Sequence, residues 1–285
     1  MQRHGPADWR QRGGAAGAAG AAGTPSGTWR AGKAAPVIGI TADLVEPASA
    51  DPARPSRPRA TVAMAYCEMI ARAGGVPVVL PPLPALAPEH VRRCDGFVLT
   101  GGDDPRTEPF GEPTHPKASP LVHPRRQEYE TALLRLLDAP AEAGGAGGGP
   151  VLGVCLGMQM MALVAGGSLC QHLPDEVPTA DRHAGNSVHP VRLVGDAPHP
   201  ILVFGKAGEA GAGAGEVMSS HHQAVRSPGR LRVVAVADDG VIEAIDDPTR
   251  RFYLGVQWHP ERTADEALGA GLFAKLVEAA RAVRG

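Results

Sequence analysis

A cysteine stands between two glycines in the segment GVCLG, Gly153 to Gly157. A short apolar run precedes it and an apolar segment with helical spacing follows it. A cysteine at such a strand-to-helix turn lies at a helix N-terminus, where the dipole and free N–H groups favour the thiolate. The N–H of Leu156 would then point towards an oxyanion formed when sulfur attacks a carbonyl carbon. The pattern alone is equally compatible with a buried, inert Cys155, because cysteine is among the most buried residue types.

The segment GVQWHPE, residues 255–261, offers partners for this cysteine. A thiol that attacks an amide needs a base to take its proton and later to protonate the leaving nitrogen, and histidine does this near neutral pH. His259 follows a run typical of a strand, and Glu261 could hold its ring in one tautomer. A surface turn with a chance histidine is the less favoured interpretation, because the cysteine turn is also present.

A third strand-like run ends at LTGGDD, residues 99–104. Gly101 and Gly102 would let main-chain N–H groups approach a substrate oxygen closely. A glycine pair is weak evidence by itself, since any tight turn explains it.

Elements that could position these groups alternate along the first half of the chain. Short β-branched runs bounded by glycine or proline predict strands, over 36–41, 76–81, 94–102 and 150–154. Apolar residues at helical spacing predict helices, over 61–73, over 125–137 and directly after Gly157. This alternation is typical of a parallel sheet covered by helices on both faces.

The second half adds four predicted strands and a closing helix, at 188–194, 231–237, 241–246, 253–257 and 264–283. We therefore expect one α/β domain over residues 36–285, with a mostly parallel central sheet and added antiparallel strands. In such sheets reactive groups gather at the carboxyl ends of strands, which is where all three motifs fall.

Glycine and alanine dominate three other stretches. Residues 1–35 predict a disordered tail, and no compact apolar segment of a targeting peptide follows its first basic residues. Residues 140–150 and 205–216 predict flexible surface loops. The long Pro-rich segment 106–126 is compatible with a lid over a site and equally with a disordered excursion.

Charge and cysteine content exclude several classes of protein. The formal charge is −2 over 285 residues, which indicates neither nucleic acid nor an anionic membrane as partner. No apolar run reaches the roughly 20 residues of a membrane helix. The four cysteines form no CxxC pair, so we expect a reduced, cytoplasmic setting, with Cys67, Cys94 and Cys170 as packing residues.

With these motifs in view, the sequence resembles the class I glutamine amidotransferase family. The match is TGG, then GVCLGMQ, then HPE, in that order. A finer resemblance is to the free-standing γ-glutamyl hydrolases of peptidase C26 type, typified by γ-glutamyl-γ-aminobutyrate hydrolase. It covers the chain from about Pro36 onward and lies in these segments: AGGVPVVLPP, CDGFVLTGGDDPRTEPFGE, GGSLCQHL, SSHHQAV, DGVIEAI and YLGVQWHPE.

The resemblance implies a flavodoxin-like sheet and a site whose residues can be named. It implies Cys155 as nucleophile, His259 as base and Glu261 as orienting acid. Main-chain N–H groups at Gly102 and Leu156 would form the oxyanion hole. The implied substrate-pocket residues are Gly101, Arg126, Gln159, His222 and Gln223.

The implied reaction is hydrolysis of a small γ-glutamyl amide through a thioester, releasing glutamate and an amine, as in polyamine catabolism. The resemblance implies no metal and no organic cofactor, and it allows a homodimer. One departure leaves the substrate open. Leu156 stands where the hydrolases often carry a basic residue, and GVCLGMQ is more typical of subunits that supply ammonia to a separate synthetase. Such a glutaminase subunit is the alternative function, and a binding protein that has lost turnover is disfavoured because the whole triad is present.

Two further residue sets have competing interpretations. Arg126 and Glu130, spaced i, i+4, fit the hydrolases and equally fit a surface ion pair. Several histidines could be assembled into a metal site, but their spacing matches no known ligand pattern and no carboxylate accompanies them in register. Pocket or surface histidines are therefore expected at these positions: His183, His189, His221 and His222.

Overall fold

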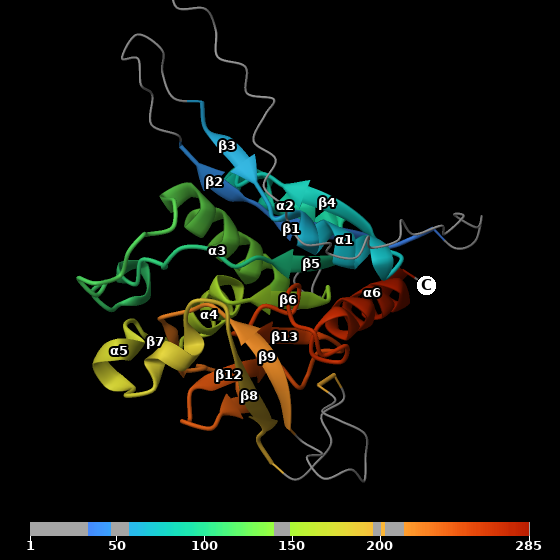
Figure 1. The fold of residues 1–285 in the computed structure, drawn as a ribbon. Helices are drawn as coiled ribbons and strands as arrows, with labels where there is room; N and C mark the ends of the chain where they lie inside the picture. The colour runs from blue at the N-terminus through green and yellow to red at the C-terminus, as the bar shows by residue number, and fades with distance from the viewer. Residues whose placement is uncertain (1–33, 47–56, 140–148, 196–200, 203–213, 285) are drawn as a thin grey trace, which may run out of the picture. The chain divides into compact units, whose positions relative to one another are not determined.

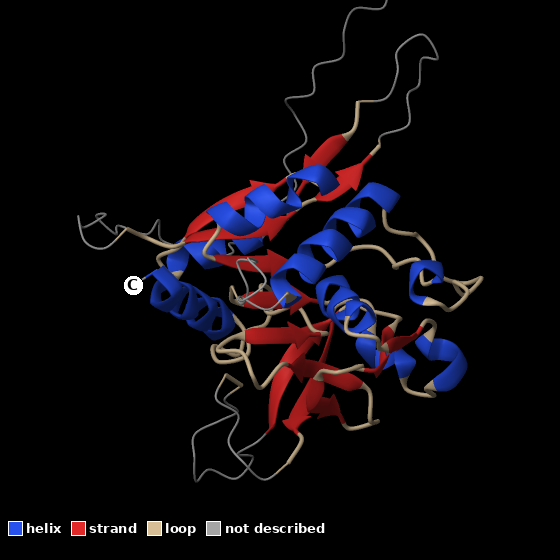
Figure 2. Ribbon diagram, turned by 180° about the vertical axis from the view of Figure 1, so that it is seen from behind, coloured by secondary structure: helices blue, strands red, loops and turns tan. Residues whose placement is uncertain are grey.

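A computed structural model describes residues 34–46, 57–139, 149–195, 201–202 and 214–284 (Figures 1 and 2). All of them belong to one unit, Lys33–Gly285. The predicted tail lies almost wholly outside the described residues, as do most of the two predicted glycine-rich loops. Within the described part of the chain, no helix has the length and apolar character needed to cross a membrane.

The strands are these: β1 (Val37–Thr41), β2 (Asp43–Val45), β3 (Arg59–Thr61), β4 (Val76–Leu80), β5 (Gly96–Leu99), β6 (Val151–Val154), β7 (Ser168–Cys170), β8 (Ser187–Leu193), β9 (Ala214–Ser219), β10 (Ala224–Ser227), β11 (Arg232–Ala237), β12 (Ile242–Asp246) and β13 (Tyr253–Val256). The α-helices are α1 (Met64–Arg72), α2 (Ala87–Arg93), α3 (Pro124–Asp138), α4 (Leu156–Val164), α5 (Leu173–Glu176) and α6 (Ala270–Arg284). Short 3₁₀ turns are η1 (Pro84–Leu86), η2 (Glu108–Phe110) and η4 (Ala180–His183).

The main sheet has a parallel half and an antiparallel half. Its order is β4-β1-β5-β6-β13-β12-β11-β8-β9; off this path, β10 pairs with β12 and β7 pairs with β10. Neighbours from β4 to β13 are parallel, and β12, β11, β8 and β9 continue the sheet antiparallel. The expected α/β domain with a mostly parallel centre and added antiparallel strands is thus confirmed.

Alternate residues of the central strands face two separate cores. Leu152 and Val154 of β6 join one core with residues of α1 and α6, whereas Val151 joins the other with residues of α3 and α4. Both faces of the central strands are therefore covered, which explains why these strands read as continuous apolar runs. Figures 1 and 2 show the helices on either side of the sheet.

Several predicted boundaries were wrong. The helix predicted from residue 61 begins at Met64, and the strand predicted over 94–102 is confined to Gly96–Leu99. The loop predicted to continue to residue 216 ends earlier, because β9 begins at Ala214 and its Gly215 pairs with Val191 of β8. This pairing overrides the low strand propensity of alanine and glycine. The closing helix begins at Ala270 and not at 264, because the Asp265 carboxylate accepts the N–H groups of Ala267 and Leu268 and forms a turn there.

The glycines around Cys155 are required by close packing. A Cβ on Gly157 would lie 2.3 Å from the main-chain oxygen of Leu99 in β5, and a Cβ on Gly153 would lie 2.8 Å from the carbonyl carbon of Gly157. Real Cβ atoms do not approach backbone so closely, so β5, β6 and α4 meet at a distance that only glycine permits.

We predict that Gly157→Ala lowers the free energy of unfolding by about 2 kcal/mol or more, because the new methyl group forces β5 and α4 apart. Helix propensity alone would favour alanine by about 1 kcal/mol, so the sign of the effect isolates the steric clash. Denaturant unfolding of the purified chain measures it. Gly149→Ala is the matched control, since its Cβ would meet nothing nearer than 3.7 Å. Equal stability of Gly157→Ala and wild type would contradict the packing account.

Candidate active site

The TGG, GVCLG and HPE motifs lie at the carboxyl ends of three adjacent parallel strands, β5, β6 and β13. β6 lies between β5 and β13, and Gly153 is in register with Leu99 on one side and Gly255 on the other. The segments that follow these strands therefore emerge at the same edge of the sheet. The structure confirms the prediction that Cys155 and His259 follow neighbouring strands.

Cys155 occupies a strained turn directly after β6. Its backbone has φ 50° and ψ −106°, a conformation that costs a non-glycine residue about 1–3 kcal/mol. The strain is held by main-chain hydrogen bonds: the Cys155 N–H donates to the Val256 carbonyl at 2.8 Å, and its carbonyl accepts the N–H of Gln159 at 3.1 Å. Leu156 begins α4, so its N–H has no acceptor within the helix.

His259 lies between the thiol and a carboxylate. Its Nδ1 is 2.7 Å from Glu261 Oε1, and all three side chains are nearly buried. Burial disfavours the imidazolium, but hydrogen bonding and charge from Cys155 and Glu261 outweigh it and raise the pKa of His259 to about 9. At neutral pH the ring is therefore positively charged and can donate a proton.

The main chain around His259 is fixed by antiparallel strands. The His259 N–H donates to the Met218 carbonyl of β9, and the Gln257 N–H donates to the Glu243 carbonyl of β12, both at 2.8 Å. Between them, the fully buried Trp258 donates its Nε1–H to the Leu268 carbonyl at 3.0 Å. The antiparallel half of the sheet thus sets the position of His259.

Gly101 packs against the side chains of Cys155 and His259. A Cβ on Gly101 would lie 3.0 Å from His259 Cε1 and 3.5 Å from Cys155 Cβ. Its N–H donates to the Tyr66 hydroxyl at 3.3 Å. Burial, and secondarily the charge of Glu261, raise the pKa of Tyr66 well above its usual value, so it stays protonated. Tyr66 could not be predicted as a site residue from the sequence, because it is one apolar-face residue of α1 and belongs to no motif.

Arg126 is fully buried and is not a surface residue, so the surface ion-pair interpretation was wrong. Its Nη2 donates to the carbonyls of Thr100 and Gly101, at 2.9 and 3.0 Å. Its Nε donates to Glu130 at 3.0 Å. Nη1 lies 3.3 Å from Asp43 Oδ1, and a Cβ on Gly102 would collide with it. Arg126 therefore fixes the main chain of the glycine loop, by which we mean residues 100–102 after β5. Its contact with substrate stays a prediction.

The other predicted pocket residues form one connected group. Gln159 donates to the Gln223 carbonyl at 3.3 Å, and Gln223 donates to the Gln171 carbonyl at 2.8 Å. His222 Nε2 is 2.8 Å from Asp104 Oδ2, and this hydrogen bond raises the pKa of His222. The structure thus ties the segment around His222 to the loop that follows Gly102.

The Pro-rich segment 106–126 has defined contacts with the rest of the domain. The Asp104 carboxylate accepts the Ser119 N–H at 2.9 Å, and Gln171 Oε1 accepts the His115 N–H at 2.7 Å. These bonds hold the segment against Asp104 and against Gln171, the residue that follows β7, which contradicts a disordered excursion.

The other cysteines and histidines differ in their surroundings: the cysteines are isolated free thiols, whereas three histidines lie in one group. All four cysteines are free thiols; Cys170 is buried, whereas Cys67 and Cys94 are partly buried. Three of the four histidines that sequence reasoning weighed as metal ligands lie together, with Glu243 as their carboxylate. The expectation that no carboxylate accompanies them was wrong. Spacing gave no signal, because the four groups come from separate segments of the antiparallel half.

Comparison with known proteins agrees with this architecture. Residues 36–261 match the model of the Peptidase C26 family. The protein "Putative glutamine amidotransferase Rv2859c" of Mycobacterium tuberculosis is 37% identical over 269 residues, covering 89% of this chain and 78% of that protein. The "Gamma-glutamyl-gamma-aminobutyrate hydrolase PuuD" of Escherichia coli K12 is 31% identical over 227 residues, covering 75% and 84%.

A solved structure shows the same fold at low identity. It is the "putative gmp synthase subunit a protein" of Thermoplasma acidophilum, with a TM-score of 0.57 and 15% identity, covering 88% of this chain and 96% of that one. The ordered strand-end motifs, the fold and the family match lead to one conclusion: the chain belongs to the Peptidase C26 family of glutamine amidotransferase-like proteins.

Proposed function

We propose that this protein is a cysteine-dependent hydrolase of small γ-glutamyl amides. The observation that carries the proposal is Cys155 in a strained turn beside the His259–Glu261 pair. Strain of this kind persists only where the surrounding structure enforces it, and it is common at functional sites. A buried cysteine with a packing role alone would not need it.

The sulfur of Cys155 attacks the amide carbon of the substrate, and the electron pair of the carbonyl moves onto oxygen. The N–H groups of Leu156 and Gly102 stabilise that oxyanion. His259 then donates its proton to the leaving nitrogen, the C–N bond breaks, and the amine departs from a γ-glutamyl thioester. His259 next takes a proton from water, and the oxygen of that water attacks the thioester carbon. The C–S bond then breaks, which releases glutamate and leaves the Cys155 thiolate beside the charged His259.

Glu261 keeps the His259 ring oriented and stabilises its positive charge. Tyr66 and Arg126 position the glycine loop through its N–H and carbonyl groups. The predicted substrate contacts stay Gly101, Gln159, His222, Gln223 and Arg126. A hydrolase that acts alone is supported by the similarity to the E. coli protein, which carries a hydrolase name.

The alternative is a glutaminase subunit that delivers ammonia to a synthetase. Leu156 after the nucleophile favours it, and the relative from M. tuberculosis carries an amidotransferase name. The two functions differ in what the purified chain does by itself, so kinetics with the two substrates separates them.

We predict that the purified chain hydrolyses γ-glutamyl-γ-aminobutyrate with a kcat/KM at least about 10-fold above that for glutamine, because the hydrolase must recognise both halves of its substrate. Glutamate release in a coupled assay measures both. Cys155→Ala should lower the rate by about 10³-fold or more while the circular dichroism spectrum is unchanged. Appreciable turnover of glutamine only when a synthetase is added would support the ammonia-supplying alternative instead.

We also predict an alkaline fall in kcat/KM with a midpoint near pH 9, where His259 loses the proton that it must give to the amine. Glu261 raises the pKa of His259, so Glu261→Gln should move that midpoint to lower pH and lower kcat by about 10²-fold or more. Glu266→Gln, on an exposed side chain nearby, is the control and should leave the profile in place. An unmoved midpoint in Glu261→Gln would show that Glu261 does not act on His259.

A further inference from the structure

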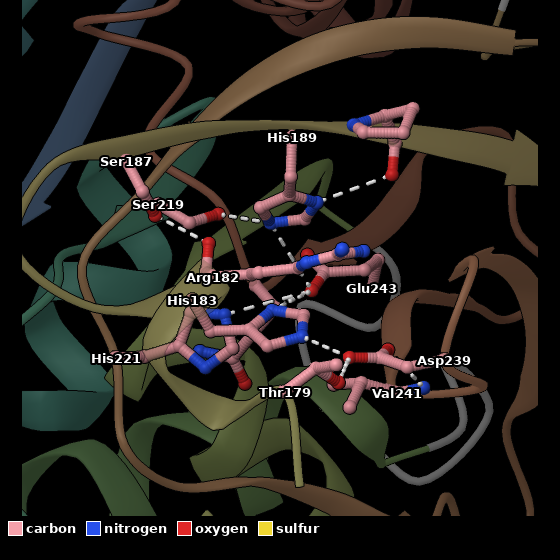
Figure 3. A network of polar contacts seen from close by, with 12 residues as sticks. Thr179, Arg182, His183, Ser187, His189, Ser219, His221, Asp239, Val241 and Glu243 are labelled. Atoms are coloured by element: carbon pink, nitrogen blue, oxygen red, sulfur yellow. Dashed lines mark hydrogen bonds and ion pairs between the residues drawn. The ribbon is translucent and has the colours of Figure 1, made fainter. Parts of the chain in front are cut away.

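Four buried side chains converge in the antiparallel half of the domain, away from the thiol chemistry. One ligand atom each from His183, His189, His221 and Glu243 lies within 4.8 Å of the others (Figure 3). They come from η4, β8, the segment between β9 and β10, and β12. All four are at most 5% exposed, and Glu243 is fully buried. We call these four residues the histidine cluster.

Each imidazole of the histidine cluster has one nitrogen committed to an outer oxygen. His183 Nε2 is 2.9 Å from Asp239 Oδ2, His221 Nδ1 is 2.9 Å from the Gln223 carbonyl, and His189 Nδ1 is 3.1 Å from the Pro190 carbonyl. Carboxylate and carbonyl oxygens only accept, so these nitrogens carry the proton. A ring that carries only this proton presents a lone pair at its opposite nitrogen.

Those lone pairs surround one carboxylate oxygen. Glu243 Oε1 lies 3.1 Å from His183 Nδ1, 3.5 Å from His221 Nε2 and 3.7 Å from His189 Nε2. His189 Nε2 also accepts the Ser219 hydroxyl at 2.8 Å. Within the described part of the chain, His183 Nδ1, His221 Nε2 and both oxygens of Glu243 have no hydrogen-bond partner.

A buried carboxylate facing three acceptors is unfavourable unless something positive lies between them. Added protons on the rings would supply charge, and so would a cation. Three imidazole nitrogens and one carboxylate oxygen are the donor set of a first-row divalent metal, whereas calcium and magnesium prefer oxygen ligands only. With metal–ligand bonds of about 2.0 Å, shifts of about 1 Å would bring the four atoms into a tetrahedron.

We propose that the histidine cluster binds one divalent transition-metal ion, zinc by preference, as a closed structural site. The contacts around the ligands are those that orient metal-bound histidines. Asp239 accepts from His183 and is itself held by the Thr179 hydroxyl at 2.6 Å, and a main-chain carbonyl orients each of the other two rings. Four protein ligands leave no open position, so the ion stabilises the fold and does not activate water.

The histidine cluster is connected to the main chain that holds His259. The Glu243 carbonyl accepts the Gln257 N–H, and Met218, whose carbonyl accepts the His259 N–H, directly precedes Ser219. The His221 N–H donates to the His183 carbonyl at 2.7 Å, so two of the ligands also share a backbone bond. A metal ion here would tie β8, β12 and the segment that follows β9 to one another, next to the main chain that holds His259.

Metal analysis of the full chain tests the proposal, and its readout does not depend on the proposed hydrolase activity. Protein purified without a histidine tag should contain about one zinc per chain by mass spectrometry of metals. Glu243→Gln should contain almost none, because a neutral amide removes the charge that holds the ion. Two controls should keep the metal: Cys155→Ser, and His115→Ala, whose ring lies outside the histidine cluster. Loss of zinc in Cys155→Ser would place the ion at the thiol and overturn the proposal.

Thermal unfolding and cobalt spectra provide a second test that does not require Glu243→Gln to fold. Chelation should lower the Tm of the wild-type chain by about 5 °C or more, and added Zn²⁺ should restore it. Co²⁺ added to the chelated protein should give the intense visible absorption of a tetrahedral site in wild type and in Cys155→Ser. A chain that contains no metal and shows neither a Tm shift nor a cobalt spectrum would show that the histidine cluster holds protons in place of a metal ion.

Discussion

The close approach of β5, β6 and α4 is the constraint on which the site depends. Gly157 contacts the main chain of β5 and Gly153 contacts Gly157, so no side chain separates the elements at this point. The chain turns from β6 into α4 through an unfavourable conformation at Cys155, and its hydrogen bonds to Val256 and Gln159 hold that conformation. Packing of the central sheet thus produces a cysteine side chain at a helix N-terminus, next to the ends of two other strands.

The segments that follow the two neighbouring strands, β5 and β13, are held by different parts of the structure. The glycine loop after β5 is held by the buried Arg126 and by the Tyr66 hydroxyl. The HPE turn after β13 is held by the carbonyls of Met218 and Glu243, in the antiparallel half of the sheet. The parallel half therefore sets the position of the thiol and the antiparallel half sets that of the imidazole, which explains why a buried ion at the histidine cluster would matter to the site.

Much of this arrangement could be predicted from the sequence because the informative residues lie next to strand boundaries. Cys155 directly follows β6, and the Gly101–Gly102 pair and His259 come shortly after β5 and β13, so the parallel sheet brings them to one edge. The burial of Arg126, the contact of Tyr66 with Gly101 and the grouping of Glu243 with three histidines could not be predicted. Those contacts join segments far apart in the chain, and β9, whose alanine and glycine residues resemble a loop, is part of the framework that forms them.

The most direct test of the central claim, that the strained cysteine is the nucleophile of a γ-glutamyl-cleaving site, is peptide mass spectrometry after reaction with a glutamine-analogue diazo-ketone. Such a reagent must be recognised as a γ-glutamyl group before it alkylates sulfur. We predict a covalent adduct on Cys155 that γ-glutamyl substrate blocks, whereas Cys67, Cys94 and Cys170 should stay unmodified. Alkylation of those three thiols in place of Cys155, or inactivation without any adduct on Cys155, would contradict it.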